Sequence, residues 1–426
     1  MTDMETSNTN PSQVKILGQP AQQGRWLLIP LGMAILLCLG TVYSWSIFRT
    51  PLENELGISA TQSLLPFTFS LVFYAATMPI AGFYIPRIGT RLTTAIGGLV
   101  VGLGYILSSF ANQVSLLVVT YGMIAGVGVG IVYGVPMVVA SRWFPDKKGL
   151  AVGLVVLGFG LSPFITAPLA NHLISAYGAR PTLRLLGMAF IVLILALALT
   201  MKLPPQGWQP QQHPDTIQPT ASLSYPPTLF KSRSFYGLWS CYAIATLVGL
   251  SAIGISGPVG EEIIQIDSTM AASSVSLFAI FNGVSRPLFG WLSDRFKPQY
   301  IATFSYALIL IGCILMIKAR TGQVTEYRVA FSLFWFCLGG WLAMAPTLTL
   351  RFFNPDHYAQ NYGIIFTAYG IGALIGTLVT GRIRDLFGTY NYVFYPMALL
   401  AIIGIIICVT IQGLTEERGL EGVHRV

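Results

Sequence analysis

Arg286 is the residue whose surroundings point most directly to chemistry. It lies within an apolar stretch, about eight residues before Asp294 and so roughly 12 Å into a helix. We assign every other ionisable residue to a loop or a tail, so no Asp or Glu is expected to accompany it. A charge buried among apolar residues is costly unless it has a partner. We therefore expect an anionic ligand to supply the counter-charge. The alternative is an arginine that caps backbone carbonyls and only joins helices.

A guanidinium group suits one kind of anion particularly well. Its planar fork can bind a carboxylate through two parallel hydrogen bonds, which a sugar or a cation would not exploit. Asn282 precedes Arg286 by four residues and would share its helical face. The pair predicts a site for a small organic anion, with Asn282 adding a hydrogen bond.

Three tyrosines lie near the centres of other apolar stretches: Tyr43, Tyr133 and Tyr369. Each could donate a hydrogen bond to a carboxylate or hydroxyl while keeping a pocket apolar. Each could also be an ordinary core residue.

Residues suited to other chemistry are sparse. The four histidines, at 172, 213, 357 and 424, are scattered, and we interpret His172 as an interfacial residue rather than a proton carrier. The five cysteines fall in apolar stretches without CxxC spacing. We therefore expect no enzyme activity, no metal site and no cofactor.

The composition predicts an integral membrane protein. Only 9% of the residues are charged and 54% are hydrophobic, whereas soluble domains carry about 25% charged residues. Twelve apolar stretches are long enough to cross a hydrocarbon core of roughly 30 Å. We place these all-α transmembrane spans at 26–48, 61–84, 92–110, 115–140, 149–174, 183–201, 236–257, 271–292, 300–318, 328–350, 362–380 and 391–413.

Positive charge sets the expected orientation. With both termini in the cytoplasm, 15 Lys and Arg residues fall on the cytoplasmic side and 8 on the other. We expect a multi-pass plasma (inner) membrane protein, monomeric, with the lipid bilayer as its surroundings. The net charge of +8 reflects this topology and needs no nucleic-acid partner.

The chain contains a repeat at an offset of 210 residues. Gly130 and Pro136 match Gly340 and Pro346, and the later matches are Pro145 with Pro355, Asp146 with Asp356, Gly153 with Gly363, Gly160 with Gly370, and Gly178 with Gly388. Two six-helix halves with the same orientation follow from this. We expect a tail at 1–25, a bundle at 26–201, a Pro- and Gln-rich cytoplasmic linker at 202–235, a second bundle at 236–413 and a tail at 414–426.

The loops after the second and eighth spans match each other. They read GFYIPRIGTR and GWLSDRFKPQ and contain the candidate gating residues Gly82, Arg87, Gly290, Asp294 and Arg295. We expect Asp294 and Arg295 to form an ion pair that gates or tethers helices. A solvated, positively charged loop is the alternative.

Longer runs resemble a known family. AGVGVGIVYGVPMVVASRWFPDKKGLAVG, FNGVSRPLFGWLSDR and NYGIIFTAYGIGALIG are similar to the oxalate:formate antiporter family of the major facilitator superfamily, which is related to the monocarboxylate transporters. The resemblance implies a carboxylate carrier that works by alternating access. It also implies that Arg286 is the substrate-binding arginine and that Tyr43 and Tyr133 line the cavity.

One departure from the family bears on the substrate. The resemblance implies a second buried cation, a lysine, in the eleventh helix of oxalate exchangers, and Tyr369 stands at that position here. Leu338 and Leu342 likewise replace aromatic residues of the oxalate site. One arginine balances one negative charge, so we expect a monocarboxylate such as lactate, pyruvate or formate. Proton symport or anion exchange would drive it. Oxalate:formate exchange, inorganic anion transport and a non-transporting receptor of the same fold remain open.

Overall fold

Long apolar helices make up almost the whole structure, a computed structural model that describes residues 15–205, 208, 229–353 and 358–412. Twelve helical segments in this part of the chain are long and apolar enough to cross a membrane. In lipid a helix satisfies its own backbone hydrogen bonds, which is why a chain this poor in charge folds into such segments. The all-α class and the twelve predicted spans are confirmed.

The first six spans follow a short antiparallel hairpin of two strands, in which Lys15 pairs with Pro20. The elements are β1 (Lys15–Ile16), β2 (Gln19–Pro20), α1 (Ala21–Gly24), η2 (Arg25–Leu27), α2 (Leu28–Gly40), η3 (Thr41–Ser44), α3 (Trp45–Leu56), α4 (Ala60–Ile88), α5 (Thr90–Ser108), α6 (Val114–Leu117), η4 (Val118–Ala125), α7 (Gly126–Trp143), η5 (Pro145–Lys147), α8 (Lys148–Tyr177) and α9 (Ala179–Ala198).

The last six spans begin after the predicted linker. Their elements are η6 (Leu229–Lys231), α10 (Arg233–Val259), η7 (Gly260–Ile264), α11 (Ser268–Arg295), α12 (Pro298–Lys318), α13 (Val324–Phe352), α14 (Tyr358–Phe387), η9 (Tyr390–Val393), α15 (Phe394–Ile407) and η10 (Cys408–Gln412).

Some spans are longer than the sequence predicted. The first runs over Ala21–Leu56 and the seventh over Arg233–Ile264, beyond the predicted 26–48 and 236–257. The prediction ended each span at the first polar residues. In the folded chain those residues find partners inside the bundle, so the helix continues past them.

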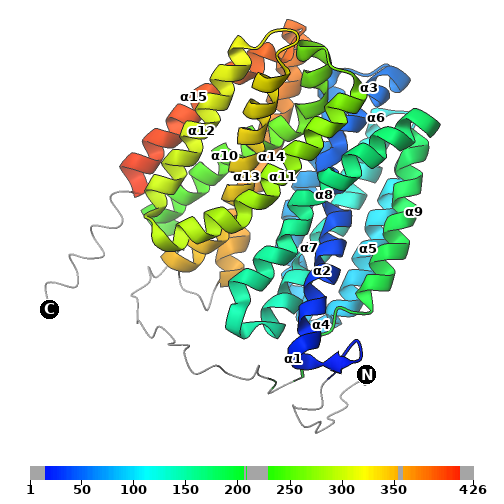
Figure 1. Cartoon of the computed structure of the whole chain (residues 1–426), viewed down its shortest axis with the longest axis vertical. Helices are drawn as coiled ribbons and strands as arrows, with labels where there is room; N and C mark the ends of the chain where they lie inside the picture. Colours follow the sequence, from blue (N-terminus) through cyan, green and yellow to red (C-terminus); the bar gives the residue numbers. More distant parts are fainter. Residues whose placement is uncertain (1–14, 206–207, 209–228, 354–357, 413–426) are drawn as a thin grey trace, which may run out of the picture.

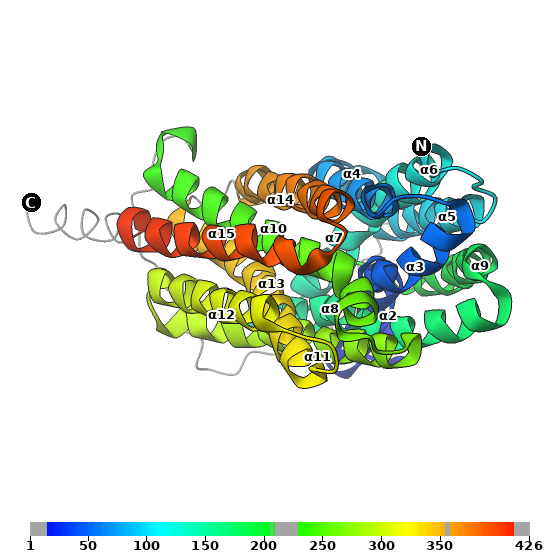
Figure 2. The same cartoon turned by 90° about the horizontal axis from the view of Figure 1, so that it is seen from above.

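The two halves lie side by side (Figures 1 and 2). Helices α2 to α9 form one half and α10 to α15 form the other. Three helix pairs supply most of the contact between them: α8 packs against α11, α4 against α14, and α3 against α10. We call the end with the β1–β2 hairpin and η5 the terminal end, and the opposite end, where α3 gives way to α4, the far end.

The predicted repeat is visible in the helix bounds. Helices α8 and α14 cover Lys148–Tyr177 and Tyr358–Phe387, which coincide at the offset of 210 residues. Both end at a glycine with positive φ, +89° at Gly178 and +73° at Gly388, a conformation that other residues adopt only at a cost. The matched glycines therefore end equivalent helices of the two halves.

Most residues of the predicted linker at 202–235 and of the predicted tails at 1–25 and 414–426 fall outside the described residues. These bounds stay predictions, although α10 already begins at Arg233.

A buried arginine, Arg25, links the start of the first span to the end of α7 and to η5 at the terminal end. Arg25 donates to both carboxylate oxygens of Asp146, at 2.5 and 3.0 Å, and to the carbonyl of Trp143 at 3.1 Å. Its guanidinium also lies 4.6 Å from the ring centroid of Phe144. Partial burial disfavours the charged carboxylate of Asp146, but the hydrogen bonds and the charge of Arg25 outweigh that effect and lower its pKa.

This pair gives a pH-dependent prediction for Asp146→Asn. Because the pKa of Asp146 is lower in the folded state, the pair contributes its full stability above the unfolded pKa of about 4 and loses it as the pH falls through the folded value. The variant should therefore melt at a lower temperature than the parent at pH 7. The gap should shrink below about pH 4. Thermal unfolding in detergent at both pH values measures this, and an equal gap at both would contradict the ion pair.

Candidate functional site

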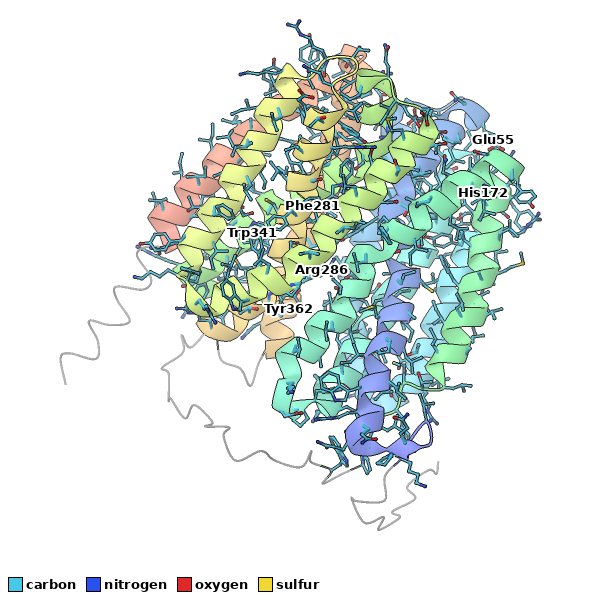
Figure 3. The ribbon with its side chains drawn as sticks, in the orientation of Figure 1. Glu55, His172, Phe281, Arg286, Trp341 and Tyr362 are labelled. Carbon is cyan, nitrogen blue, oxygen red and sulfur yellow. The ribbon has the colours of Figure 1, made fainter. Side chains whose placement is uncertain are left out.

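Arg286 is buried at the boundary between the two halves. Figure 3 shows it on α11, away from both ends of the bundle. Only 3% of the surface of Arg286 is exposed. Nη1 donates to the carbonyl oxygen of Val156 on α8 of the other half at 3.1 Å, and Nη2 donates to Oδ1 of Asn282 at 3.2 Å. Among the described residues, no carboxylate pairs with this guanidinium.

Asn282 holds the guanidinium from one helical turn away, on the shared face that the spacing predicted. Its own Nδ2 donates to the carbonyl of Trp335 on α13 at 2.8 Å. This bond fixes the amide so that its oxygen faces Arg286. In this arrangement Asn282 orients the arginine, and one of its two amide N–H groups is already used.

Tyr43 and Tyr369 join the halves next to this pair. Their hydroxyls lie 3.0 Å apart, one on η3 and the other on α14. Two of the three predicted tyrosines therefore meet each other across the boundary.

Tyr133 belongs to the same aromatic cluster through its neighbours. Its ring packs edge-on against Tyr74 and Phe159, with centroids 5.1 and 5.3 Å apart. Phe159 also packs against Tyr43 at 5.1 Å. Tyr133 thus lies one ring away from the Tyr43–Tyr369 pair.

Sequence reasoning missed several residues of this cluster. Tyr74 on α4 packs against Tyr369 at 5.7 Å and against Phe366 at 5.7 Å, and Trp335 packs against Tyr43 at 6.1 Å. These rings come from apolar runs in which nothing marks one aromatic residue above another. The Val156 carbonyl is a backbone group and leaves no mark in the sequence.

The predicted gating loops lie at the terminal end. Gly82 and Arg87 are exposed near the end of α4, and Arg295 lies over the ring of Trp291 at 4.4 Å. Gly290 lies on α11 with open space beside it. The side chain of Asp294 is outside the described part of the chain. The proposed Asp294–Arg295 pair therefore remains a prediction.

Arg49 corrects the expectation that Arg286 is the only charge within a span. It lies in the first span on α3 and is completely buried. It donates to Oε1 of Glu53 at 3.0 Å, to the Tyr390 hydroxyl at 2.7 Å and to the carbonyl of Gly254 at 3.1 Å. The sequence prediction ended the span at residue 48, although the helical segment continues to Leu56. Hydropathy falls at Arg49, and nothing local shows that three other elements supply partners, namely Ala60 and Ser63 of α4, Gly254 of α10 and Tyr390 of η9.

Carboxylates also lie within the spans at the far end, contrary to the prediction. Glu262 pairs with Arg384 at 2.6 Å, and Asp385 accepts from the backbone amide of Ala60 at 3.0 Å. Glu261 accepts from the hydroxyl of Thr50 at 2.7 Å. The Asp385 and Glu261 contacts cross between the halves, so polar bonds close this end of the boundary.

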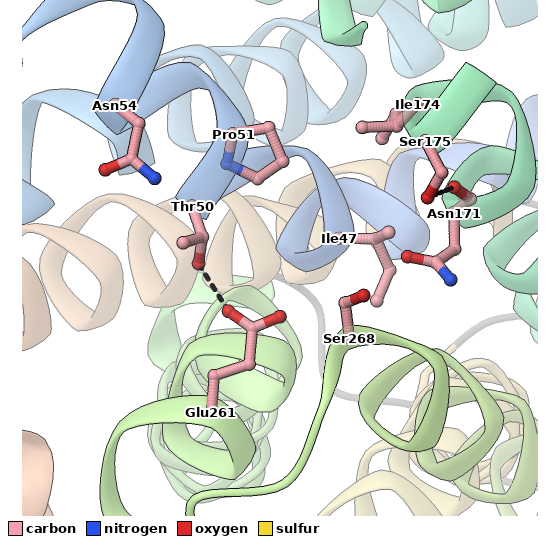
Figure 4. A pocket seen from close by; sticks show the side chains of 9 residues that line it. All are labelled: Ile47, Thr50, Pro51, Asn54, Asn171, Ile174, Ser175, Glu261 and Ser268. Atoms are coloured by element: carbon pink, nitrogen blue, oxygen red, sulfur yellow. Dashed lines mark hydrogen bonds between the residues drawn. The ribbon is translucent and has the colours of Figure 1, made fainter. Parts of the chain in front are cut away.

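A small pocket of about 160 Å³ opens beside the Thr50–Glu261 contact (Figure 4). Asn54, Asn171, Ser175 and Ser268 give it a polar lining. His172, next to Asn171, is exposed at the far end (Figure 3), and its interfacial role stays a prediction.

Comparison with known proteins agrees with this architecture. The family model described as Major Facilitator Superfamily matches residues 31–349 and 252–422. The chain belongs to the major facilitator superfamily. The predicted superfamily is confirmed, and the chain is a multi-pass transporter of that superfamily and not an enzyme.

Individual relatives are more distant. The chain is 28% identical over 384 residues to the oxalate:formate antiporter of Oxalobacter formigenes, covering 89% of both chains. It is 25% identical over 456 residues to the human monocarboxylate transporter 14, covering 86% of both. A bacterial homologue of the human lysosomal transporter Spinster has the same fold, with a TM-score of 0.68, 16% identity, and 92% and 96% of the two chains covered.

The buried Arg49 cluster predicts a large effect on stability. Removing one partner of a buried ion pair costs roughly 3–5 kcal/mol, whereas an exposed pair contributes about 0–1 kcal/mol. Arg49→Ala should therefore lower the melting temperature in detergent far more than Arg180→Ala. Arg180 pairs with Glu55 at the same end, and both side chains are about a third exposed, 33% and 34%.

A double variant separates the charge from the packing. Arg49→Ala with Glu53→Ala should recover part of the lost stability, because no uncompensated carboxylate is then left behind. Equal melting temperatures for Arg49→Ala and Arg180→Ala would contradict the assigned role of the buried pair.

Proposed function

We propose that this transporter carries small carboxylates, most specifically monocarboxylates, by alternating access, and that Arg286 binds the carboxylate. One observation carries the proposal: a buried guanidinium stands at the boundary between the halves, and its described partners are neutral. The buried charge is thus solvated by dipoles alone. An anion with two oxygens would compensate it fully.

The Val156 contact fits this proposal as well as the tethering alternative. The bond to Val156 joins the charged guanidinium to a neutral dipole, whereas a carboxylate would bring a full opposite charge. A substrate carboxylate can therefore compete with the carbonyl for Nη1. Since Val156 belongs to the opposite half, that exchange would link substrate binding to the contact between the halves.

Charge balance favours a monoanion over oxalate. Arg286 carries one positive charge, and the other two buried arginines of the described residues, Arg25 and Arg49, are already paired with Asp146 and Glu53. A dianion would leave one carboxylate to neutral donors such as the hydroxyls of Tyr43 and Tyr369. Leaving a charge uncompensated in an apolar site is costly.

The relatives support a carboxylate cargo and leave a specific alternative. One is named an oxalate:formate antiporter and another a monocarboxylate transporter. Oxalate:formate exchange is therefore the second candidate. It would require the tyrosine hydroxyls to hold the second carboxylate.

Transport would be driven by co-transported protons or by exchange with an internal anion. We further propose that the chain lies in the plasma membrane with both termini in the cytoplasm, on the strength of the 15 to 8 distribution of Lys and Arg.

Replacing the arginine tests the proposed site directly. Truncating one partner of a buried charge pair costs roughly 2–5 kcal/mol, so Arg286→Gln should weaken uptake of labelled lactate and formate by about 30-fold or more. Uptake is measured in proteoliposomes with and without a pH gradient or an internal counter-anion. Arg320→Gln, which removes an exposed charge from the loop after α12, is the matched control and should transport normally. Full uptake by Arg286→Gln would rule out the assigned site.

The charge-balance argument is tested at Tyr369. Tyr369→Lys places a second cation beside Tyr43 and should allow oxalate uptake, which the parent should lack. Tyr369→Phe removes the same hydroxyl without adding charge and should gain none. Oxalate exchange by the parent would instead show that one arginine and neutral donors suffice for a dianion.

A further inference from the structure

Arg49 bonds to both halves of the molecule, and its only charged partner lies in the first half. Nε donates to Oγ of Ser63 at 2.9 Å, and Nη2 donates to Oε1 of Glu53 at 3.0 Å and to the carbonyl oxygen of Ala60 at 3.1 Å. These partners lie on α3 and α4. Glu53 supplies the opposite charge, so the guanidinium is compensated within the first half. If the halves separate, Arg49 should stay with the first half.

The second half holds Arg49 through two neutral groups. Nη1 donates to the carbonyl oxygen of Gly254 on α10 at 3.1 Å, and Nη2 donates to the hydroxyl oxygen of Tyr390 on η9 at 2.7 Å. Breaking both bonds leaves the Arg49–Glu53 pair intact. The boundary can therefore open at these bonds without leaving an unpaired charge behind.

Tyr390 is held in place by the second half. Its side chain is buried, and its backbone N–H donates to Oε1 of Glu262 at 3.3 Å. Glu262 pairs in turn with Arg384 at 2.6 Å. The guanidinium groups of Arg49 and Arg384 lie 5.6 and 5.7 Å from the centroid of the Tyr390 ring. A movement of the second half would thus carry the Tyr390 hydroxyl away from Arg49.

The Arg49–Tyr390 contact lies between the centre of the molecule and its far end. On the first span Arg49 follows Tyr43 by six residues and precedes the end at Leu56 by seven. It therefore lies roughly 9 Å from the level of Tyr43 and roughly 10 Å from the end of the span. Separation of the halves at this level would open a route from the far end toward the Tyr43–Tyr369 contact.

We propose that Tyr390 is the gate residue of the far end: its hydroxyl holds Arg49 while the far end is closed and releases it when the halves separate, with Arg49 remaining on Glu53. The inference rests on the alternating access of the proposed function and does not depend on the identity of the cargo. It adds the residue that controls access from the far end.

Thr377 provides a reporter of opening. It is completely buried on α14, and its hydroxyl is in hydrogen-bond contact with that of Thr68 on α4 of the other half. It lies eight residues, or roughly 12 Å, nearer the far end than Tyr369. The Tyr43–Tyr369 contact therefore lies between Thr377 and the terminal end. A cysteine at residue 377 should react with a maleimide mainly when the far end is open.

Tyr327 is the matched control for Tyr390. It is a buried tyrosine of the second half near the same end, and its hydroxyl donates to the carbonyl oxygen of Ser256 at 2.6 Å. Both partners of that bond belong to the second half, on α13 and α10. Tyr327→Phe therefore removes an equivalent hydroxyl without removing a bond between the halves.

The test measures how fast a sulfonated maleimide labels Thr377→Cys in purified protein in lipid nanodiscs. Loss of one hydrogen bond to a charged group shifts an equilibrium by about 10-fold or more, so Tyr390→Phe should raise the labelling rate by that factor. Tyr327→Phe should leave the rate at that of Thr377→Cys alone. The protein with only its five native cysteines, all of them buried, gives the background rate.

Two results would overturn the gate assignment: an unchanged labelling rate in Tyr390→Phe, or an equal rise in Tyr327→Phe. Either could occur while the parent takes up lactate and Arg286→Gln does not, in which case the proposed cargo would stand. Faster labelling in Tyr390→Phe with no carboxylate uptake by the parent would refute the proposed cargo and support the gate.

A second variant covers the case in which Tyr390→Phe does not fold. Arg49→Lys keeps a positive charge for Glu53 but replaces the planar fork, which reaches both Gly254 and Tyr390, by a single ammonium group. Combined with Thr377→Cys, it should also raise the labelling rate by about 10-fold or more. A rate equal to that of Thr377→Cys alone would contradict the proposal.

Discussion

The packing at the centre of this molecule depends on the hydrogen bonds of one guanidinium, which is buried between the two bundles and has neutral partners. The charge of Arg286 is solvated there by two dipoles, the Val156 carbonyl of one half and the Asn282 amide oxygen of its own helix. The Asn282 amide is in turn fixed by the Trp335 carbonyl. Three helices, α8, α11 and α13, must therefore hold their relative positions for a single charge to be tolerated.

The far end meets the same physical demand in a different way. There Arg49 has a carboxylate, a tyrosine hydroxyl and backbone carbonyls around it, so its charge is compensated inside the protein. The central arginine is solvated, whereas the far-end arginine is neutralised. This contrast explains why the first suits a transient anionic partner and the second suits a structural bond between helices.

The sequence predicted the features that depend only on residues close together in the chain. Twelve apolar stretches, the repeat and the shared face of Asn282 and Arg286 follow from composition and helical periodicity. Tyr43 and Tyr369 were expected as separate cavity residues, and their contact across 326 positions appears only in the fold. Arg49 was assigned to a loop because hydropathy falls there, and apart from Glu53 on its own helix its partners come from α4, α10 and η9. The Val156 carbonyl could not be predicted because every residue has one. What the sequence lacks in each case is the identity of the neighbour.

Helices α8 and α14 approach the other half closely at two glycines. A β-carbon on Gly160 would stand 3.2 Å from the α-carbon of Gly283 on α11, and one on Gly370 would stand 3.2 Å from the β-carbon of Ala75 on α4. Gly160 lies roughly 18 Å along α8 from its start and roughly 26 Å from its end, at 1.5 Å per residue. A rigid tilt of about 10° about this crossing would move the far end of the helix by roughly 4 Å but the Val156 carbonyl, one turn away, by only about 1 Å. The same geometry holds for α14 about Gly370, whose far end carries Arg384 and Asp385. Rotation of the halves would thus break the bonds at the far end while the residues around Arg286 move little. A bound anion would then become accessible from the other side of the membrane with little displacement of its own.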